Sequence, residues 1–477
     1  MHRIFLFGIA LTALVWPRWV QAATPLETPI PALSDASMKH DQWVHKAILE
    51  AYDAVGHHNP KWDEAARKAL ALSADMWGPP RFRGDGNFAQ YTIAKGAIDA
   101  GCDDPMVLFA YARTFSSFGR DPEQCFALHQ RAADALSRSK YSRHYAALAH
   151  LRTAQIQVEL LVAKARSDNK PIDPEGWKEV TRRVSIAMGL TALMAKEKDL
   201  PLAQWVEIGV AMAGVFSDGV ASTQTAVEFA FPFYEKNAPK VAALTIKGEL
   251  YTTWAWDARG RGFANTVKDE GWKLMQERLA VAQKALEEAW QLDPTNSSAA
   301  TYMIDVELGQ GQGRDRMELW FKRAMQADPD NYEACKAKLN YLEPKWYGTP
   351  KDMIEFGREC LKTGRFQTFV PNTLCQAHYS LSHYTQGGYN RASDPAYYQT
   401  PGVWNDLRDV YDGYLRGDKG ASLELTQNGY AQLACKCQAW DDAAKMFTTI
   451  GDHFDPRVWT KEQCEAARAT ALANAKK

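Results

Sequence analysis

The sequence has little net charge and no long block of one sign. Its 56 basic and 57 acidic residues leave a formal charge of −1 at pH 7. A protein that binds nucleic acid needs a basic face, so this balance argues against a nucleic-acid partner. Beyond the first residues the chain also lacks an uncharged apolar run of membrane-spanning length, which predicts no later transmembrane helix.

The one continuous apolar run lies at the start of the chain. Met1–Arg3 is short and basic, Ile4–Trp16 is apolar, and Ala22 is a small residue suited to cleavage. This order is typical of a secretory signal peptide, here over residues 1–22. A membrane anchor is the alternative, but Pro17 ends the run short of the roughly 20 residues that a bilayer needs. The sequence therefore predicts a periplasmic or secreted protein.

Motifs that carry catalysis or metal binding are missing. The chain has no HExxH or GxSxG sequence, and the histidine pairs His40/His45 and His378/His383 are spaced five residues apart. That spacing turns two side chains about 140° apart on a helix, so neither pair can hold one metal from a single face. Gly309–Gly313 is rich in glycine but follows a helical pattern and lacks the lysine of a phosphate loop. We therefore expect no catalytic residue, no metal site and no cofactor.

Cysteine is scarce, with eight residues in the whole chain, but the number is even. An even number in an exported protein permits disulfides. If two antiparallel helices are joined near Tyr347, Cys335 and Cys360 face each other across that hairpin. Cys375 would face Cys360 across the next turn, so Cys360 has two candidate partners. Free buried thiols are the alternative.

Helical periodicity dominates what is present. Residues 23–37 are rich in proline and predict a flexible N-terminal arm. From Met38 onward apolar residues recur with a helical period, and no alternating pattern is long enough for a sheet. The pattern is irregular over 38–250 and more regular over 251–477. Because composition changes little between them, one continuous superhelix is as consistent as two regions.

A short motif recurs in the regular region. Ala289–Asn296 reads AWQLDPTN, and Ala324–Asn331 reads AMQADPDN after a shift of 35 residues. An amphipathic helix precedes each copy, and Tyr430–Pro456 forms a further related unit. A single pair of such helices cannot bury its apolar face alone, so the pairs are expected to stack.

These units resemble the tetratricopeptide repeat, although the match is degenerate and covers about three units. Gly101–Pro105, Trp254–Gly262 and Asn340–Pro350 also resemble an exported bacterial family of unknown function. The resemblance implies an all-α fold, an open superhelix of antiparallel helix pairs with an irregular N-terminal half. It implies no activity.

The first helix of each pair lines the concave face of such a superhelix, where these proteins bind their partners. That register places six polar side chains on the face: Asp305, Glu333, Lys336, Asn340, Gln432 and Lys436. Mixed charge of this kind suits a peptide or a chain end. A merely solvated face is the alternative.

The stretch Trp254–Gly262 is the second candidate binding site. Arg259 and Arg261 alternate with glycines at a helix end, and two such arginines could grip a carboxylate or phosphate. Trp254 could then face a groove. The alternative is a capping junction between the two halves of the superhelix.

The sequence favours a non-catalytic module of the cell envelope that binds a protein or peptide. The alternative is a secreted all-helical enzyme, an α/α toroid hydrolase or lyase that cleaves polysaccharides with two carboxylates. Such an enzyme needs inward acidic residues at the mouth of a closed barrel. The recurring Asp-Pro motif favours an open superhelix instead.

Overall fold

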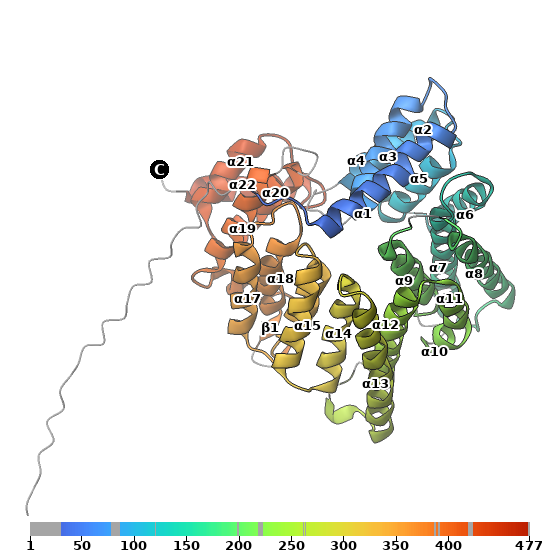
Figure 1. The fold of residues 1–477 in the computed structure, drawn as a ribbon. Coiled ribbons are helices and arrows are strands. Elements are labelled where there is room, and N and C mark those ends of the chain that lie inside the picture. Colours follow the sequence, from blue (N-terminus) through green and yellow to red (C-terminus); the bar gives the residue numbers. More distant parts are fainter. Residues whose placement is uncertain are drawn as a thin grey trace, which may run out of the picture.

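The structure is a computed structural model that describes residues 30–77, 86–119, 121–197, 200–217, 223–260, 262, 264–385, 388–389, 392–417 and 423–475. The predicted signal peptide lies outside these ranges. Helices make up most of the described chain, and they follow one another as packed pairs along an arc (Figure 1). This confirms the predicted all-α superhelix of antiparallel, tetratricopeptide-like helix pairs.

The first half of the chain forms twelve helices among the described residues. They are α1 (Asp35–His45), α2 (Ala51–Val55), α3 (Asp63–Trp77), α4 (Gly86–Asp99), α5 (Pro105–Phe118), α6 (Pro122–Arg138), α7 (Arg143–Asp168), α8 (Pro174–Met194), α9 (Leu202–Ser217), α10 (Thr223–Thr225), α11 (Phe231–Asn237) and α12 (Lys240–Arg259). A π-helical turn, Lys46–Glu50, joins α1 to α2, and another, Ala226–Ala230, joins α10 to α11.

The second half continues in the same way. Its helices are α13 (Asp269–Leu292), α14 (Ser297–Gln310), α15 (Arg314–Ala327), α16 (Tyr332–Tyr341), α17 (Pro350–Lys362), α18 (Thr373–Ser382), α19 (Val403–Gly417), α20 (Leu423–Lys436), α21 (Trp440–Ile450) and α22 (Lys461–Asn474). Short 3-10 turns lie at Ala264–Thr266, Val370–Asn372 and Pro395–Gln399. In the described chain, strand pairing is confined to β1 (Tyr384–Thr385) and β2 (Gly388–Tyr389), with Tyr384 opposite Tyr389.

Alternate helices form the inner layer of the arc. Helices α7, α9, α12, α14, α16 and α18 contact one another in succession. The outer helices α13, α15 and α17 make no comparable contacts with each other in the described residues. A stack whose layers are spaced unequally curves toward the closer layer, so the inner helices line the concave face.

The recurring Asp-Pro-x-Asn motif starts an inner helix and ties it to the one before. Asn296 caps α14 by accepting from the Ala299 N–H, and it donates to Thr245 Oγ1 of α12 at 2.8 Å. Asn331 caps α16 in the same way and donates to Thr301 Oγ1 of α14 at 2.9 Å. One side chain thus satisfies an orphan helix amide and fixes the spacing of neighbouring inner helices.

The boundary predicted between residues 250 and 251 falls inside α12. One buried cluster ends at Leu250 and the next begins at Ala255, so a single helix contributes to both cores. Helix α12 packs closely on α13 because Gly248 has no side chain. A β-carbon there would lie 2.2 Å from Leu286 Cγ. No linker separates the two regions at this point.

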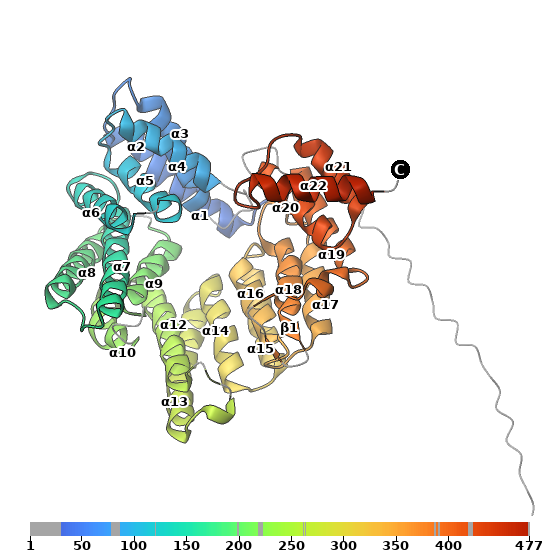
Figure 2. The same cartoon turned by 180° about the vertical axis from the view of Figure 1, so that it is seen from behind.

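Residues 30–34, which we call the strap, tie the N-terminal end of the arc to the connections that follow α15 and α17. Helix α1 lies next to the C-terminal helices in both views (Figures 1 and 2). The Ser34 N–H donates to Asp330 Oδ2 at 2.6 Å, and the Ser34 hydroxyl donates to Asp328 Oδ1 at 2.7 Å. Arg365 binds both the Ala32 carbonyl, at 3.3 Å, and Asp330, at 2.7 Å.

The strap is also anchored by apolar contact, since Ile30 packs on the cluster that contains Phe366 and Tyr414. The flexible arm expected over 23–37 is therefore corrected for its second part. Residues 30–34 are held by specific contacts, and α1 begins at Asp35. The sequence pattern could not show this, because the contacts are made with residues some 300 positions away.

Candidate functional site

The predicted concave residues of α14 and α16 lie together on the inner layer. Asp305 is half-buried on α14, and Glu333 is exposed on α16. The two carboxyl groups act on their neighbours through their charge. Glu333 contributes to the raised pKa of Asp305, and both carboxyl groups contribute to the raised pKa of Tyr302. Glu249 of α12 acts on Tyr302 as well. We call Glu249, Tyr302, Asp305 and Glu333 the acidic patch.

Burial perturbs two carboxyl groups of the acidic patch strongly. Burial and the charge of Glu333 raise the pKa of Asp305 to about 6. Burial, aided by Asp305, raises the pKa of Glu249 to about 7. Both side chains are only half-buried, so protein must surround them on several sides, as at the floor of a concave surface.

The carboxyl groups also lack cationic partners. Asp305 makes no hydrogen bond or ion pair with any described residue, and Glu249 Oε2 is shielded without a partner. Glu249 Oε1 accepts only from the Thr253 hydroxyl, at 3.3 Å. Desolvated carboxyl groups without a partner are costly, and such an arrangement is typical of binding sites rather than of packing.

Lys336 and Asn340 of α16 border the acidic patch. Lys336 forms an ion pair with Glu333 at 2.7 Å and lies 5.3 Å from the ring centroid of Tyr332. Asn340 follows one turn later and is half-buried. Of the six concave residues predicted from the sequence, the structure thus gathers four: Asp305, Glu333, Lys336 and Asn340.

The other two concave residues lie apart from these, on α20. Gln432 donates to the Val458 carbonyl at 2.7 Å and so holds the segment that precedes α22. Lys436 is exposed, with its amine 5.8 Å from the Tyr398 ring centroid. Helices α20–α22 have a core of their own, and the irregular segment between α18 and α19 interrupts the repeat. The amide of Gln432 thus makes a packing contact, and its binding role stays a prediction.

The second predicted site is a structural junction. Arg259 lies 5.7, 5.5 and 5.5 Å from the ring centroids of Trp256, Trp272 and Trp346, and it donates to the Gly260 and Gly262 carbonyls. Its guanidinium lies among aromatic rings and is hydrogen-bonded, contacts that agree with a structural role, and ligand binding by Arg259 stays a prediction. Arg261 lies outside the described residues.

Trp254 belongs to the same junction. Its ring centroid lies 3.8 Å from the Arg278 guanidinium carbon, and its carbonyl accepts from Arg278 at 2.7 Å. The indole therefore stacks on α13 and does not face a groove. The alternative reading of this stretch, a junction between the two halves, agrees with these contacts.

The cysteines are all described and all carry free thiols. Cys335 and Cys360 face each other across the α16–α17 hairpin, with their sulfur atoms 4.0 Å apart. Cys375 lies elsewhere, against a cluster that includes Tyr398 and Leu407. Of the two pairings left open by the sequence, the geometry favours Cys335 with Cys360.

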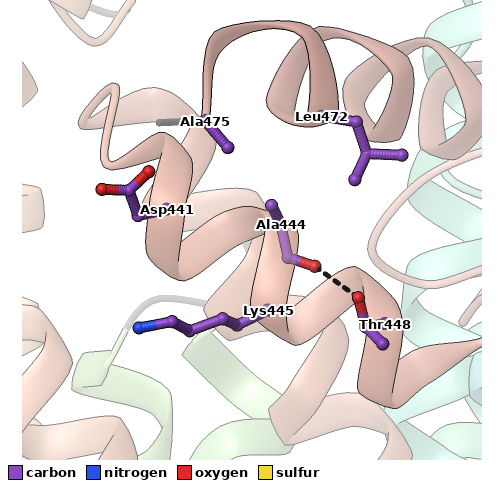
Figure 3. Close-up of a pocket in the computed structure, with 6 residues that line it drawn as sticks. All are labelled: Asp441, Ala444, Lys445, Thr448, Leu472 and Ala475. Carbon is purple, nitrogen blue, oxygen red and sulfur yellow. Dashed lines mark hydrogen bonds between the residues drawn. The ribbon is translucent and has the colours of Figure 1, made fainter. Parts of the chain in front are cut away.

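A pocket opens at the far end of the chain, between α21 and α22 (Figure 3). Asp441, Ala444, Lys445 and Thr448 line it from α21, and Leu472 and Ala475 line it from the end of α22. The Thr448 hydroxyl donates to the Ala444 carbonyl at 3.0 Å, so it is not available as a donor to a ligand. The polar side chains come from one helix, and nothing here suggests chemistry.

The described residues contain no group of three or more His, Cys, Asp or Glu side chains that could hold a metal ion. No helix in these ranges has both the length and the apolar character needed to cross a bilayer.

Comparisons with known proteins add little. No family model and no curated protein matches the sequence. A crystal structure of yeast Tom70 is 12% identical, with 86% of this chain and 95% of that chain covered, at a TM-score of 0.21. A structure of Naa15/Naa10 bound to HypK-THB is 11% identical, with 91% and 98% covered, at a TM-score of 0.17. Scores this low carry no argument, so the fold rests on the helix packing described above.

Proposed function

We propose that this protein binds a protein or peptide on its concave face, and that the acidic patch receives a basic side chain of that partner. The observation that carries the proposal is Asp305. Its carboxyl group is crowded by three inner helices, yet it has no partner among the described residues. A lysine or arginine from a bound segment would supply the missing charge.

The patch selects for cationic groups by its charge. Glu249, Asp305 and Glu333 together outnumber Lys336, the cation that pairs with Glu333. Charge complementarity of this kind contributes to specificity and to the rate of association. An extended segment fits such a surface because successive inner helices offer side chains along one line.

Binding should depend on pH in a defined direction. Asp305 and Glu249, with pKa values raised to about 6 and about 7, lose their protons between pH 5.5 and pH 8. The charged form attracts the basic side chain, so affinity for a cationic peptide rises over this interval.

The test uses an arrayed library of random decapeptides, probed at pH 5.5 and pH 8. The expected result is selection of peptides rich in lysine and arginine, with stronger binding at pH 8. The double variant Glu249→Gln/Asp305→Asn should weaken binding about tenfold, since each lost charged contact contributes about 1 kcal/mol or more.

The matched control is Glu287→Gln/Glu288→Gln on the outer helix α13, where Glu288 pairs with Lys240 at 2.6 Å. This control should bind as the unsubstituted protein does. Equal losses in both double variants would reveal a long-range charge effect. Selection of no peptides, or of peptides indifferent to the inner pair, would remove the proposal.

The cell envelope is the proposed location, supported by the signal-like order of residues 1–22. Fractionation of cells followed by N-terminal sequencing checks it. The expected mature chain starts after Ala22, and a protein that keeps its first residues in the cytoplasm would contradict the location without touching the binding proposal.

A further inference from the structure

A second polar group lies in the N-terminal half, and no sequence motif marks it. Arg113 comes from α5, His144, Tyr145 and Arg152 come from α7, and Glu207 comes from α9. Glu207, Arg152 and Tyr145 all act electrostatically on Arg113, so the five side chains lie close together. We call them the arginine site.

Arg113 is the central residue of the arginine site. Its guanidinium carbon lies 4.5 Å from the ring centroid of Trp77 and 5.8 Å from that of Phe109. No described residue accepts a hydrogen bond from it, although the side chain is half-buried. Its nitrogen atoms still reach solvent, since none is among the shielded atoms without partners. A guanidinium with five N–H donors thus lies over an indole ring and has no acceptor among the described residues.

Two neighbours of Arg113 also have polar atoms without hydrogen-bond partners. Tyr145 is only 2% exposed, and its hydroxyl has no hydrogen-bond partner. His144 is fully buried, and its Nδ1 atom is likewise unpaired, while its Nε2 lies 2.9 Å from Glu207 Oε2. Buried polar groups in native proteins are nearly always hydrogen-bonded. Several exceptions at one place indicate a site that a ligand or ordered water completes.

The charge of the arginine site defines which anion fits. Burial opposes the ionisation of Glu207, but the hydrogen bond and charge of His144, together with Arg113, prevail and lower its pKa to about 2. Glu207 is therefore charged, and Arg113 and His144 act on it. Arg152 donates only to the Gln155 side chain, at 2.9 Å, among the hydrogen bonds of the described residues. Arg113, Arg152 and Glu207 together carry one excess positive charge, which favours an anion, and the surrounding aromatic rings favour an anion with an apolar body over inorganic phosphate.

Aromatic rings form the wall around this charge. The Trp43 ring centroid lies 5.6 Å from that of His144 and 6.0 Å from that of Tyr145, and Trp77 lies 5.6 Å from Tyr145. Both tryptophans are half-buried, so part of each side chain remains exposed. Such a wall limits competition from water and favours a ligand with an apolar body.

We propose that the arginine site binds a carboxylate, with the guanidinium of Arg113 donating to both of its oxygens. Planar, two-pronged pairing is the geometry in which a guanidinium best matches a carboxylate. The carboxylate belongs either to a free monocarboxylic acid or to the end of a peptide chain. The site is separate from the acidic patch and does not depend on the binding of a basic partner there.

The test measures binding to the full chain by calorimetry, with four probes. They are benzoate, acetylated pentaalanine with a free C-terminus, the same peptide with a C-terminal amide, and inorganic phosphate. Benzoate or the free-ended peptide should bind, whereas the amide and phosphate should not. Tighter binding of benzoate identifies a free acid as the ligand, and tighter binding of the peptide identifies a chain end.

Arg113→Gln should weaken carboxylate binding by about tenfold to a hundredfold, the usual range for a lost charged hydrogen bond. Arg131→Gln, on the exposed side of α6, is the matched control and should bind normally. Arg113→Lys keeps the charge but not the fork, so it should bind weakly while remaining folded by circular dichroism.

Three results would overturn the proposal. They are no carboxylate binding by the unsubstituted protein, undiminished binding by both Arg113 variants, and phosphate binding as tight as that of the carboxylates. None of these outcomes bears on the acidic patch, because no probe carries a basic side chain.

Discussion

The two halves of the superhelix build similar helix pairs with different local chemistry. In the N-terminal half, α5, α6 and α8 each begin with an Asp-Pro step in which the aspartate caps the helix and proline occupies its first turn. In the C-terminal half, α14 and α16 are capped by asparagines that also reach the preceding inner helix. A capping aspartate can only accept hydrogen bonds, whereas asparagine also donates, so an asparagine cap can reach an acceptor on the preceding inner helix.

The inner surfaces differ in the same sense. The N-terminal half presents Arg113 against the rings of Trp77 and Phe109, and the stretch from α12 to α16 presents Glu249, Asp305 and Glu333. A stack of helix pairs therefore tolerates opposite charge on one concave face, because the pairs are held by their buried sides. The difference teaches that the regularity of a repeat and the position of its binding groups are independent.

The largest expected loss of stability comes from removing an aspartate cap. Asp104 is fully buried and accepts hydrogen bonds from the Met106, Val107 and His57 amides and from the Tyr141 hydroxyl. Asp104→Ala leaves all four donors without a partner and should lower the free energy of unfolding by about 4 kcal/mol. Urea denaturation followed by circular dichroism measures the loss.

The second kind of cap supplies the comparison. Asn331→Ala removes one accepted and one donated hydrogen bond at the edge of the core, and should cost about 1–2 kcal/mol. If Asn331→Ala lowered the free energy of unfolding as much as Asp104→Ala, this comparison would fail. The buried network of Asp104 would then contribute no more than the cap of Asn331, which is repeated along the stack.

Oxidation should stabilise the C-terminal half selectively. A Cys335–Cys360 disulfide would close a loop of 25 residues and contribute about 3 kcal/mol in the chain-entropy account. Treatment with glutathione disulfide should remove both thiols, which peptide mapping without reduction detects. Cys375→Ser should leave the bridge intact. Recovery of Cys335 and Cys360 as free thiols, or a Cys360–Cys375 bridge, would refute the pairing.

The acidic patch should lower stability above neutral pH. A carboxyl group whose pKa is raised by folding holds its proton more tightly when folded, so stability falls as pH rises toward that raised value. For Glu249 and Asp305 this fall ends near pH 7 and pH 6. Glu249→Gln and Asp305→Asn should each stabilise the protein by about 1–2 kcal/mol at pH 8, and by less at pH 5.

Thermal unfolding at the two pH values checks this prediction. Glu287→Gln on α13 serves as the control and should show no gain at either pH. A uniform gain at both pH values would mean that packing, and not charge, accounts for the effect.

The smallest expected change in stability is that caused by substituting Lys336, which pairs with Glu333 beside the acidic patch. Its ion pair with Glu333 is exposed, so Lys336→Glu should change stability by only about 0.5 kcal/mol. The same change makes the patch more negative and should strengthen binding of a cationic peptide severalfold. Lys436→Glu on α20 should alter neither quantity. A weaker complex after Lys336→Glu would show that the lysine itself contacts the partner.

The fold could be predicted because its signals are local. The AWQLDPTN and AMQADPDN motifs mark where an inner helix starts, and helical periodicity marks the rest. Asp305 and Asn340 could be placed on the concave face because each follows the asparagine of its motif at the same spacing. The motif gives no such register for Gln432, since the irregular segment before α19 interrupts the repeat.

The remaining site residues carry no local signal. Glu249 and Tyr302 meet only because α12 and α14 pack side by side, and α12 lies before the first motif. Arg113, Tyr145 and Glu207 come from three helices separated by outer helices in the sequence. Arg259 lies in a stretch rich in arginine and glycine, which suggested ligand binding, but three tryptophans from different parts of the sequence surround its guanidinium. Long-range packing decides each of these cases.

The strap limits how far the N-terminal end of the stack can move from the second half. Stacks of helix pairs are flexible along their length, and their usual low-energy motion changes the separation of the ends. Here Ser34 on Asp328 and Asp330, with Ile30 seated on its apolar cluster, resists that motion. The concave face is therefore held near one width. A partner that must widen this face has to break the contacts of residues 30–34, whereas a partner that fits the existing width does not.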